Sequence, residues 1–163
     1  YKLIEIPKHL LNEIAISSTK IRNALLKSDV DTANQLLGYP YFFSGLVIHG
    51  DKIGRTLGYP TANLQYLNND KIHLGHGVYA ATATLHKTVI NGMLSIGNRP
   101  TLTNSAEMVE INLFDFEETI YGQELKITVY KYLRAQEKYS NIDLLKSQLQ
   151  EDKLQSLKWL NRA

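Results

Sequence analysis

Segments rich in β-branched and aromatic residues follow one another along most of this chain. Glycine, proline or asparagine stands inside or between them, as in Asn91-Gly92, residues 98–100 and Tyr121-Gly122, a composition typical of strands joined by turns. The predicted strands span residues 41–49, 78–86, 88–96, 108–116 and 123–133. Successive strands at this spacing indicate an antiparallel sheet, and we expect it to close into a small barrel.

Helical patterns flank this region on both sides. Ser17 or Ser18 can cap a first helix and Asp29 a second, because short polar side chains accept hydrogen bonds from the first turn of a helix. Near the C-terminus, Ser140 and Asp143 form a capping box before apolar residues at helical spacing. The apolar face predicted for this last helix consists of Ile142, Leu145, Leu149, Leu154, Leu157 and Leu160. We therefore expect a short N-terminal helical appendage and a C-terminal helix that packs on the barrel.

The composition restricts the class of protein. With 163 residues, 44% of them hydrophobic and 21% charged, the chain suits one compact domain with a small appendage. The net charge is +2, and its 18 basic and 16 acidic residues are dispersed along the sequence, which argues against a nucleic-acid partner. Cysteine is absent, and no apolar run approaches the roughly 20 residues of a membrane span. We expect a soluble, cytoplasmic protein with no membrane or nucleic-acid partner.

Residues 50–63, with the sequence GDKIGRTLGYPTAN, are the part of the chain most indicative of function. Gly50, Gly54 and Gly58 allow a backbone to approach a ligand closely. Lys52 and Arg55 add positive charge for phosphate oxygens. The motif lacks the Gly-Lys-Ser/Thr of a Walker A loop and the Gly-x-Gly-x-x-Gly of a dinucleotide fold. From the residues alone, phosphate binding and an ordinary glycine-rich turn both stay open.

Thr61 and Asn63 follow the glycines, and their side-chain oxygens alternate along an extended segment. Both are hard, neutral ligands suited to a Mg²⁺ ion that already carries phosphate oxygens and water. We predict that these two residues lie at a magnesium site. The alternative is that they only form side-chain to backbone turns.

Glu110 is the candidate for proton transfer. In the predicted strand, Val109, Ile111 and Leu113 share one face, and the opposite face carries Met108, Glu110, Asn112 and Phe114. A carboxylate on a rigid element, beside apolar and amide groups, suits a general base. The alternative is an ordinary solvent-facing glutamate on a strand.

Together these motifs resemble those of riboflavin kinases, the enzymes that phosphorylate riboflavin to FMN. The pattern GxxxGRxLGxPTAN is similar to the nucleotide-binding loop of that family, and further blocks follow in the family's order and approximate spacing. These blocks are GVYA at 77–80, IGNRPT at 96–101, VEINLFDF at 109–116, IYGQ at 120–123 and LR at 133–134. The resemblance implies a mainly β fold, a small antiparallel Greek-key barrel with a C-terminal helix, and ATP-dependent phosphorylation of riboflavin with Mg²⁺.

The resemblance also implies roles for single residues. Glu110 would be the base for the ribityl 5′-hydroxyl of riboflavin. The residues matching the family's contacts to ATP and Mg²⁺ are Gly50, Arg55, Thr61 and Asn63, with Thr61 and Asn63 nearest the metal.

Flavin contacts are expected in the segment before the last helix, where the sequence at 133–139 is LRAQEKY. Arg134 matches the family, and Tyr139 replaces its usual phenylalanine but keeps an aromatic face for stacking. Gln136 replaces the usual glutamate and cannot reproduce a charged contact. Leu74 stands where the family commonly has proline. These departures leave open a flavin-binding regulatory module without turnover.

The first forty residues show a second resemblance. The sequence ISSTKIR at 16–22 is similar to the closing motif of the FMN adenylyltransferase module that precedes riboflavin kinase in bacterial bifunctional FAD synthetases. The resemblance implies that residues 1–40 are the remnant of that module with a linker, that residues 41–163 are the kinase domain, and that a missing N-terminal domain is its partner. The matching remnant residues are Ser17, Ser18, Thr19 and Arg22. No His-x-x-His or His-x-Gly-His element stands early in the chain, so we expect no FMN adenylyltransferase activity.

A second class of function also fits a small barrel. Exposed aromatic residues can stack bases in an OB-type binder of single-stranded nucleic acid, and the candidates here are Tyr41, Tyr66, Tyr79 and Tyr121. The dispersed charge argues against this alternative.

His73 and His76 stand three residues apart, as metal ligands can. No third ligand accompanies them at a supporting spacing, so we expect solvated loop histidines rather than a metal site.

Overall fold

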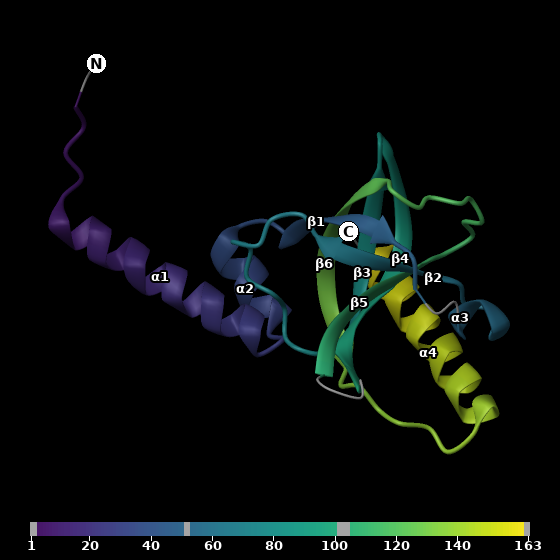
Figure 1. Ribbon diagram of the computed structural model, residues 1–163. Coiled ribbons are helices and arrows are strands. Elements are labelled where there is room, and N and C mark those ends of the chain that lie inside the picture. The colour runs from purple at the N-terminus through teal and green to yellow at the C-terminus, as the bar shows by residue number, and fades with distance from the viewer. Residues whose placement is uncertain (1–2, 51–52, 101–104, 162–163) are drawn as a thin grey trace.

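The structure is a β-barrel between two helical regions (Figure 1). A computed structural model describes residues 3–50, 53–100 and 105–161. The helices are α1 (Lys8–Leu26), α2 (Val30–Leu37), α3 (Ile53–Thr56) and α4 (Ile142–Leu160). The strands are β1 (Phe42–Ile48), β2 (Thr61–Tyr66), β3 (Gly77–Leu85), β4 (Thr88–Pro100), β5 (Ser105–Leu113) and β6 (Glu124–Arg134). The predicted fold class, mainly β with a C-terminal helix, is confirmed.

The barrel is closed, with the strand order β1-β2-β5-β4-β3-β6. Every pair of neighbouring strands is antiparallel. β3, β4 and β5 follow one another as hairpins, and β6 returns to lie beside β3, which is the connectivity of a Greek key. The predicted Greek-key barrel is therefore confirmed, and each of the described strands has a neighbour on both sides.

The core of the barrel follows from the alternation of side chains along each strand. On β5, Val109, Ile111 and Leu113 share one face, as predicted, and this face is buried in the core. Glu110 lies on the outer face and is half-buried. Tyr79 of β3 and Tyr41 are also buried in this core, so they cannot serve as the exposed stacking residues that the nucleic-acid alternative requires. Burial raises the pKa of both tyrosines to about 12.

Two strand predictions need correction. β2 was not among the predicted strands, because its polar residues weaken the apolar signal of a half-buried strand. Asn91-Gly92 and residues 98–100 were expected to be turn material, yet both lie within β4, opposite β5. A Cβ atom on Gly92 would lie 2.5 Å from the carbonyl oxygen of Asn112, so this glycine permits close strand approach rather than a turn.

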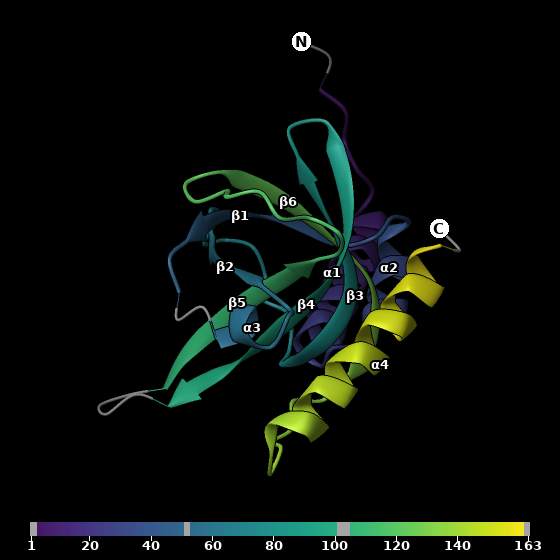
Figure 2. The ribbon, with the colours of Figure 1, turned by 90° about the vertical axis from the view of Figure 1, so that its right-hand side faces the viewer.

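α4 covers part of the outer face of the barrel and runs across β3, β4 and β6 (Figure 2). Asn141 caps it by accepting a hydrogen bond from the Leu144 amide at 2.9 Å, one residue later than the predicted cap Ser140. The predicted apolar face is partly wrong, because Ile142 and Leu154 are exposed. The buried positions of the helix are Asp152, Ser156 and Leu160. Polar side chains thus form much of the contact between this helix and the barrel.

α2 begins at the predicted cap. The Asp29 side chain accepts a hydrogen bond from the Thr32 amide at 3.2 Å. Hydrogen bonding by the Thr32 side chain, and then by its amide, lowers the pKa of the Asp29 carboxyl. Gly38 ends the helix in the left-handed conformation, with φ of 79°, which glycine adopts without strain.

α1 begins at Lys8, so the predicted cap at Ser17 or Ser18 is wrong, and both serines lie inside the helix. Pro7 precedes the first turn, where its fixed φ is compatible with a helix start. Good helix formers among residues 8–16 extend the helix towards the N-terminus.

The end of α1 and all of α2 pack on the barrel, while the N-terminal half of α1 extends away from it (Figure 1). Leu25 and Val30 belong to the barrel core. The Asn34 amide donates to the Val129 carbonyl at 3.0 Å and its oxygen accepts from the Tyr41 amide at 2.8 Å. These contacts place the helical appendage on the side of the barrel opposite α3, as Figures 1 and 2 show.

Candidate active site

Three strands bring together polar residues that lie far apart in the sequence. Asn63 of β2 stands opposite Glu110 of β5, and Glu110 stands opposite Ser95 of β4. Directly paired residues of an antiparallel sheet point to the same face, with Cβ atoms about 4.5–5.5 Å apart. The carboxylate of Glu110 therefore has an amide on one side and a hydroxyl on the other, on the outer face of the barrel.

Thr61 lies two residues before Asn63 on the same face of β2 and pairs with Asn112. The buried Asn112 side chain donates a hydrogen bond to the Pro60 carbonyl at 2.7 Å. This bond fixes the start of β2, because Pro60 enters the strand directly from the glycine-rich segment. Thr61 and Asn63 therefore occupy adjacent positions on a rigid element.

The glycines before β2 bring the backbone close to this strand. A Cβ atom on Gly50 would lie 1.9 Å from Nδ2 of Asn63, and one on Gly54 would lie 2.3 Å from the Tyr59 carbonyl oxygen. Gly58 has a positive φ of 80°, which side chains other than glycine rarely allow. Lys52, the other predicted contact to ATP in this segment, lies outside the described residues.

A cavity of about 450 Å³ opens beside β2 and β5. Arg55 and Thr61 line it, together with apolar side chains of the strands and the segment 116–121. The Gly122 amide donates to the Val47 carbonyl at 2.9 Å, which ties this segment to β1. Charged and hydroxyl groups line the cavity beside the apolar side chains, among them Arg55, Thr61, Glu117 and Glu118, and such a mixture occurs in sites for small organic ligands.

His49 stacks on Tyr121 with a ring-centroid separation of 3.9 Å. Tyr121 lines the cavity, so the histidine supports a wall of this site.

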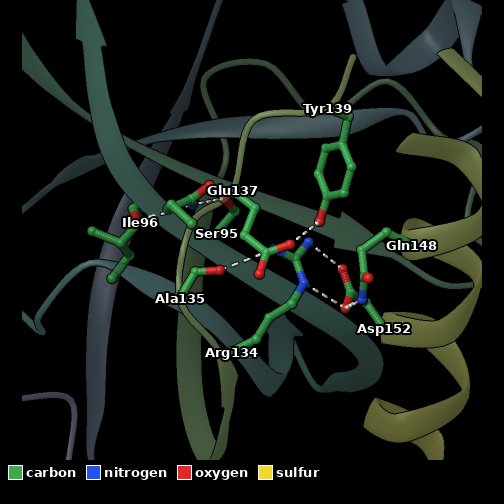
Figure 3. Close-up of polar contacts among 9 residues, drawn as sticks. Ser95, Ile96, Arg134, Ala135, Glu137, Tyr139, Gln148 and Asp152 are labelled. Carbon is green, nitrogen blue, oxygen red and sulfur yellow. Dashed lines mark hydrogen bonds and ion pairs between the residues drawn. The ribbon is translucent and has the colours of Figure 1, made fainter. Parts of the chain in front are cut away.

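Arg134 connects β6 to α4 through a paired carboxylate (Figure 3). Its Nε atom donates to Oδ1 of Asp152 at 2.8 Å, and its Nη2 atom donates to Oδ2 at 2.6 Å. Burial would lower the pKa of the guanidinium, but the hydrogen bonds and charge of Asp152 outweigh burial, and the net effect raises it. The Tyr139 ring lies 5.9 Å from the guanidinium carbon. Arg134 and Tyr139, the predicted flavin contacts, therefore lie beside each other.

Gln136 is fixed on β4 and does not project freely into solvent. Its Nε2 atom donates to the Ser95 hydroxyl oxygen at 2.7 Å and to the Ile96 carbonyl at 3.1 Å. A Cβ atom on Gly97 would lie 3.3 Å from this side chain. Gln136, which replaces the usual glutamate of the family, thus contacts Ser95, the residue paired with Glu110.

His73 and His76 lie close to Glu107, a residue that the sequence did not indicate. His73 Nδ1 lies 2.8 Å from Oε2 of Glu107, and His76 Nε2 lies 3.8 Å from Oε1. Among the described residues, no group of three or more potential ligands is arranged to hold a metal ion. Both histidine side chains are a little less than half exposed, and their partner Glu107 lies on β5, 34 residues after His73 in the chain.

The ISSTKIR residues lie apart from this site. Ser17, Ser18, Thr19 and Arg22 are exposed on α1, and the Thr19 hydroxyl donates to the Ala15 carbonyl at 3.0 Å.

Each helix in the described part of the chain is too short or too polar to span a membrane.

Comparison with known proteins decides the family. The family model described as Flavokinase: Riboflavin kinase matches residues 37–160. This chain belongs to the riboflavin kinase family. The match extends over the whole barrel and α4, so the glycine-rich segment and Glu110 lie inside the riboflavin kinase region.

Curated relatives of this riboflavin kinase domain carry the name bifunctional riboflavin kinase/FMN adenylyltransferase. The protein from Bacillus subtilis is 45% identical over 149 residues, which cover 90% of this chain and 47% of the relative. The protein from Escherichia coli is 35% identical over 142 residues, which cover 86% of this chain and 45% of the relative. The chain thus spans about half the length of these relatives.

Two solved structures share the fold. A macrolide-efflux protein from Streptococcus pneumoniae aligns with a TM-score of 0.82 at 35% identity, over 87% of this chain and 46% of that chain. Riboflavin kinase from Trypanosoma brucei aligns with a TM-score of 0.53 at 22% identity, over 75% of this chain and 80% of that chain. The second similarity supports the barrel fold alone.

Sequence reasoning missed Ser95, Asp152 and the 116–121 wall of the cavity. Asp152 had no signal in the sequence, because its burial depends on how α4 packs on the barrel. Ser95 had none either, since the position of Ser95 opposite Glu110 depends on strand register.

Proposed function

We propose that this chain transfers the γ-phosphoryl group of ATP to the 5′-hydroxyl of riboflavin, giving FMN and ADP. The observation that carries the proposal is the pairing of Asn63 with Glu110 on the outer face of the barrel, next to the glycine-rich segment. A phosphate-binding backbone, a hard oxygen ligand and a carboxylate base are the groups that phosphoryl transfer requires. Membership of the riboflavin kinase family supports riboflavin as the acceptor.

In this proposal ATP binds with its phosphates along residues 50–58 and reaches into the cavity beside β2. Gly50 and Gly54 leave room for the backbone to lie close to the strand, and Arg55 at the cavity edge supplies positive charge. The cavity volume of about 450 Å³ lies within the range of small-ligand sites. Lys52 and Gly58 complete the proposed phosphate contacts.

Thr61 and Asn63 fit a Mg²⁺ ion. They offer neutral oxygen ligands from adjacent positions on one face of β2, and Mg²⁺ in kinases commonly takes few protein ligands and completes its shell with phosphate oxygens and water. When bound, the ion neutralises charge on the phosphates. The two side chains would orient the phosphate end of ATP towards Glu110.

Glu110 acts as the general base in the proposed reaction. Its carboxylate accepts the proton of the 5′-hydroxyl while that oxygen forms a bond to the γ-phosphorus. The bond from the γ-phosphorus to the β,γ-bridging oxygen breaks, and ADP leaves with the electron pair. The rigid β5 strand holds the carboxylate between Asn63 and Ser95, which favours a fixed direction of proton transfer.

The flavin ring lies against Arg134 and Tyr139 in this proposal. Their mutual contact at 5.9 Å, and the fixation of Arg134 by Asp152, provide a preformed surface beside α4 (Figure 3). Preformed surfaces bind with a smaller loss of side-chain entropy.

Residues 1–40 are, we propose, the end of an adenylyltransferase module whose remainder is the partner of the kinase domain. The bifunctional names of the relatives support this division, and α1 with its ISSTKIR residues lies on the opposite side of the barrel from α3 (Figure 1). We expect no FMN adenylyltransferase activity from this chain, and we propose a cytoplasmic location because the reaction consumes ATP.

The test is to incubate the chain with riboflavin, ATP and Mg²⁺, and to separate riboflavin, FMN and FAD by chromatography with fluorescence detection. We expect FMN that depends on ATP, and no FAD. Riboflavin that stays bound but unphosphorylated would contradict the proposal and support the regulatory flavin-binding module.

Asn63→Ala is expected to raise the Mg²⁺ concentration needed for half-maximal FMN formation by about tenfold or more, because one oxygen ligand is lost. Gln65→Ala is the matched control, since Gln65 is exposed two residues further along the same strand. The measurement is a Mg²⁺ titration of the FMN assay. An Asn63→Ala titration that superimposes on that of the parent would remove Asn63 from the metal site.

A further inference from the structure

The segment 134–139 lies between two elements of the fold. At its start, Arg134 is paired with Asp152 of α4 through two hydrogen bonds. Figure 3 shows this part of the chain with α4 on one side and Ser95 of β4 on the other. The contact with β4 is made by the side chain of Gln136, two residues after Arg134. The segment is therefore fixed to the last helix at one point and to the barrel at another.

The side-chain amide of Gln136 has a defined orientation on β4. Its Nε2 atom lies 2.7 Å from the Ser95 hydroxyl oxygen and 3.1 Å from the Ile96 carbonyl oxygen. A carbonyl oxygen can only accept a hydrogen bond, so the group that faces Ile96 must be the NH₂ group, whose two hydrogens serve both oxygens. A carboxylate at this position would bring an acceptor against the Ile96 carbonyl, and it could not make that bond.

Gly97 leaves room for the Gln136 side chain on β4. A Cβ atom on Gly97 would lie 3.3 Å from the Cγ, Cδ and Nε2 atoms of Gln136, which are its three nearest atoms outside the adjoining residues of the chain. Gly97 is not among the described glycines with a positive φ, so its backbone conformation does not require glycine. The missing side chain at position 97 therefore serves the contact with Gln136.

We propose that Gln136 is a positioning residue for riboflavin: by fixing the segment 134–139 to β4, it holds the Arg134 guanidinium and the Tyr139 ring in place for the flavin. This inference rests on the proposed kinase function and its flavin contacts. The Tyr139 ring lies 5.9 Å from the guanidinium carbon, so the two groups form one surface only while the segment keeps its shape. A segment that is already ordered loses less entropy when the ligand binds.

The test measures KM for riboflavin and KM for ATP separately in Gln136→Glu and Gln136→Ala. Both variants lose the hydrogen bond to the Ile96 carbonyl, so KM for riboflavin should rise about tenfold, while kcat and KM for ATP stay within a few-fold of the parent. Gln65→Glu is the matched control, because it makes the same change of charge at an exposed strand residue. Its KM values should equal those of the parent.

A second experiment separates this contact from a general loss of structure. Gly97→Ala should raise KM for riboflavin about threefold or more in the parent, because the new methyl group displaces the Gln136 amide. In the Gln136→Ala background, the atoms that this methyl group would press on are absent, so Gly97→Ala should change KM by less than about twofold. An equal effect of Gly97→Ala in both backgrounds would overturn the inference.

Tyr139→Ala tests the flavin site itself, because it removes a proposed contact with the ring. If the parent forms no FMN, or if Tyr139→Ala leaves KM for riboflavin unchanged, the proposed function or its flavin site fails first. If Tyr139→Ala raises this KM and the Gln136 variants do not, only the role of Gln136 is wrong. A lower kcat with an unchanged KM for riboflavin in the Gln136 variants would also overturn the inference, since the effect would then lie in phosphoryl transfer.

Discussion

Glu110→Gln is expected to lower kcat for FMN formation by about 10²–10⁴, while KM for ATP and riboflavin changes only a few-fold. Glutamine has nearly the shape of glutamate, so the pairing of this position with Asn63 and Ser95 should persist. The amide cannot take a proton from the 5′-hydroxyl, and the loss should therefore appear in turnover rather than in binding. Steady-state kinetics with chromatographic detection of FMN measures both quantities.

Glu124→Gln is the matched control for this experiment. Glu124 is an exposed glutamate at the start of β6, and so it represents the alternative interpretation of Glu110 as an ordinary solvent-facing strand residue. Its replacement should leave kcat within a few-fold of the parent. If Glu110→Gln behaves in the same way, Glu110 is not the base, and the proton must leave through another group.

Asp152→Ala is expected to reduce the free energy of unfolding by about 3 kcal/mol, the lower end of the range for breaking a buried ion pair. The Asp152 side chain is 3% exposed and that of Arg134 is 18% exposed, so the variant leaves a largely buried guanidinium without its bidentate partner. Gln148 also loses an acceptor, since its Nε2 atom donates to Oδ1 of Asp152 at 2.9 Å. Urea unfolding followed by circular dichroism measures the change.

The control is Glu151→Ala, one residue earlier on the exposed side of α4. Glu151 accepts a hydrogen bond only from Gln155 among the described contacts, one helical turn away, and its loss should cost at most about 0.5 kcal/mol. If Asp152→Ala is no more destabilising than this control, the ion pair does not hold α4 on the barrel. If stability falls as expected, weaker riboflavin binding should accompany it, because Arg134 and Tyr139 would lose their fixed position.

Features that depend only on neighbouring residues, such as helix caps and the alternation of side chains along a strand, could be predicted from the sequence. Asp29 marks the start of α2, because an N-terminal cap depends on hydrogen bonds within the first turn of the helix. The outward direction of Glu110 follows from strand alternation. The helix caps predicted at Ser17 or Ser18 and at Ser140 are wrong, since several nearby residues can cap a helix and the tertiary surroundings select among them.

The contacts that assemble the candidate site could not be predicted in the same way. Glu110 meets Asn63 and Ser95 because β5 lies between β2 and β4 in the closed barrel. Strand order and register depend on the packing of the whole core, and a shift of one residue would turn every side chain to the other face. Arg134 and Asp152 are likewise paired by the docking of α4, in which the buried positions differ from the regular leucine pattern.

The sequence by itself determined the barrel class, the glycine-rich segment with Thr61 and Asn63, and Glu110 as the candidate base, because alternation, turn chemistry and motif spacing are properties of neighbouring residues. Only the tertiary structure decided which side chains face one another: Asn63, Glu110 and Ser95 across three strands, and Arg134 against Asp152. Those contacts join residues distant in sequence, and their geometry is determined by the closure of the barrel and by the face on which the last helix packs.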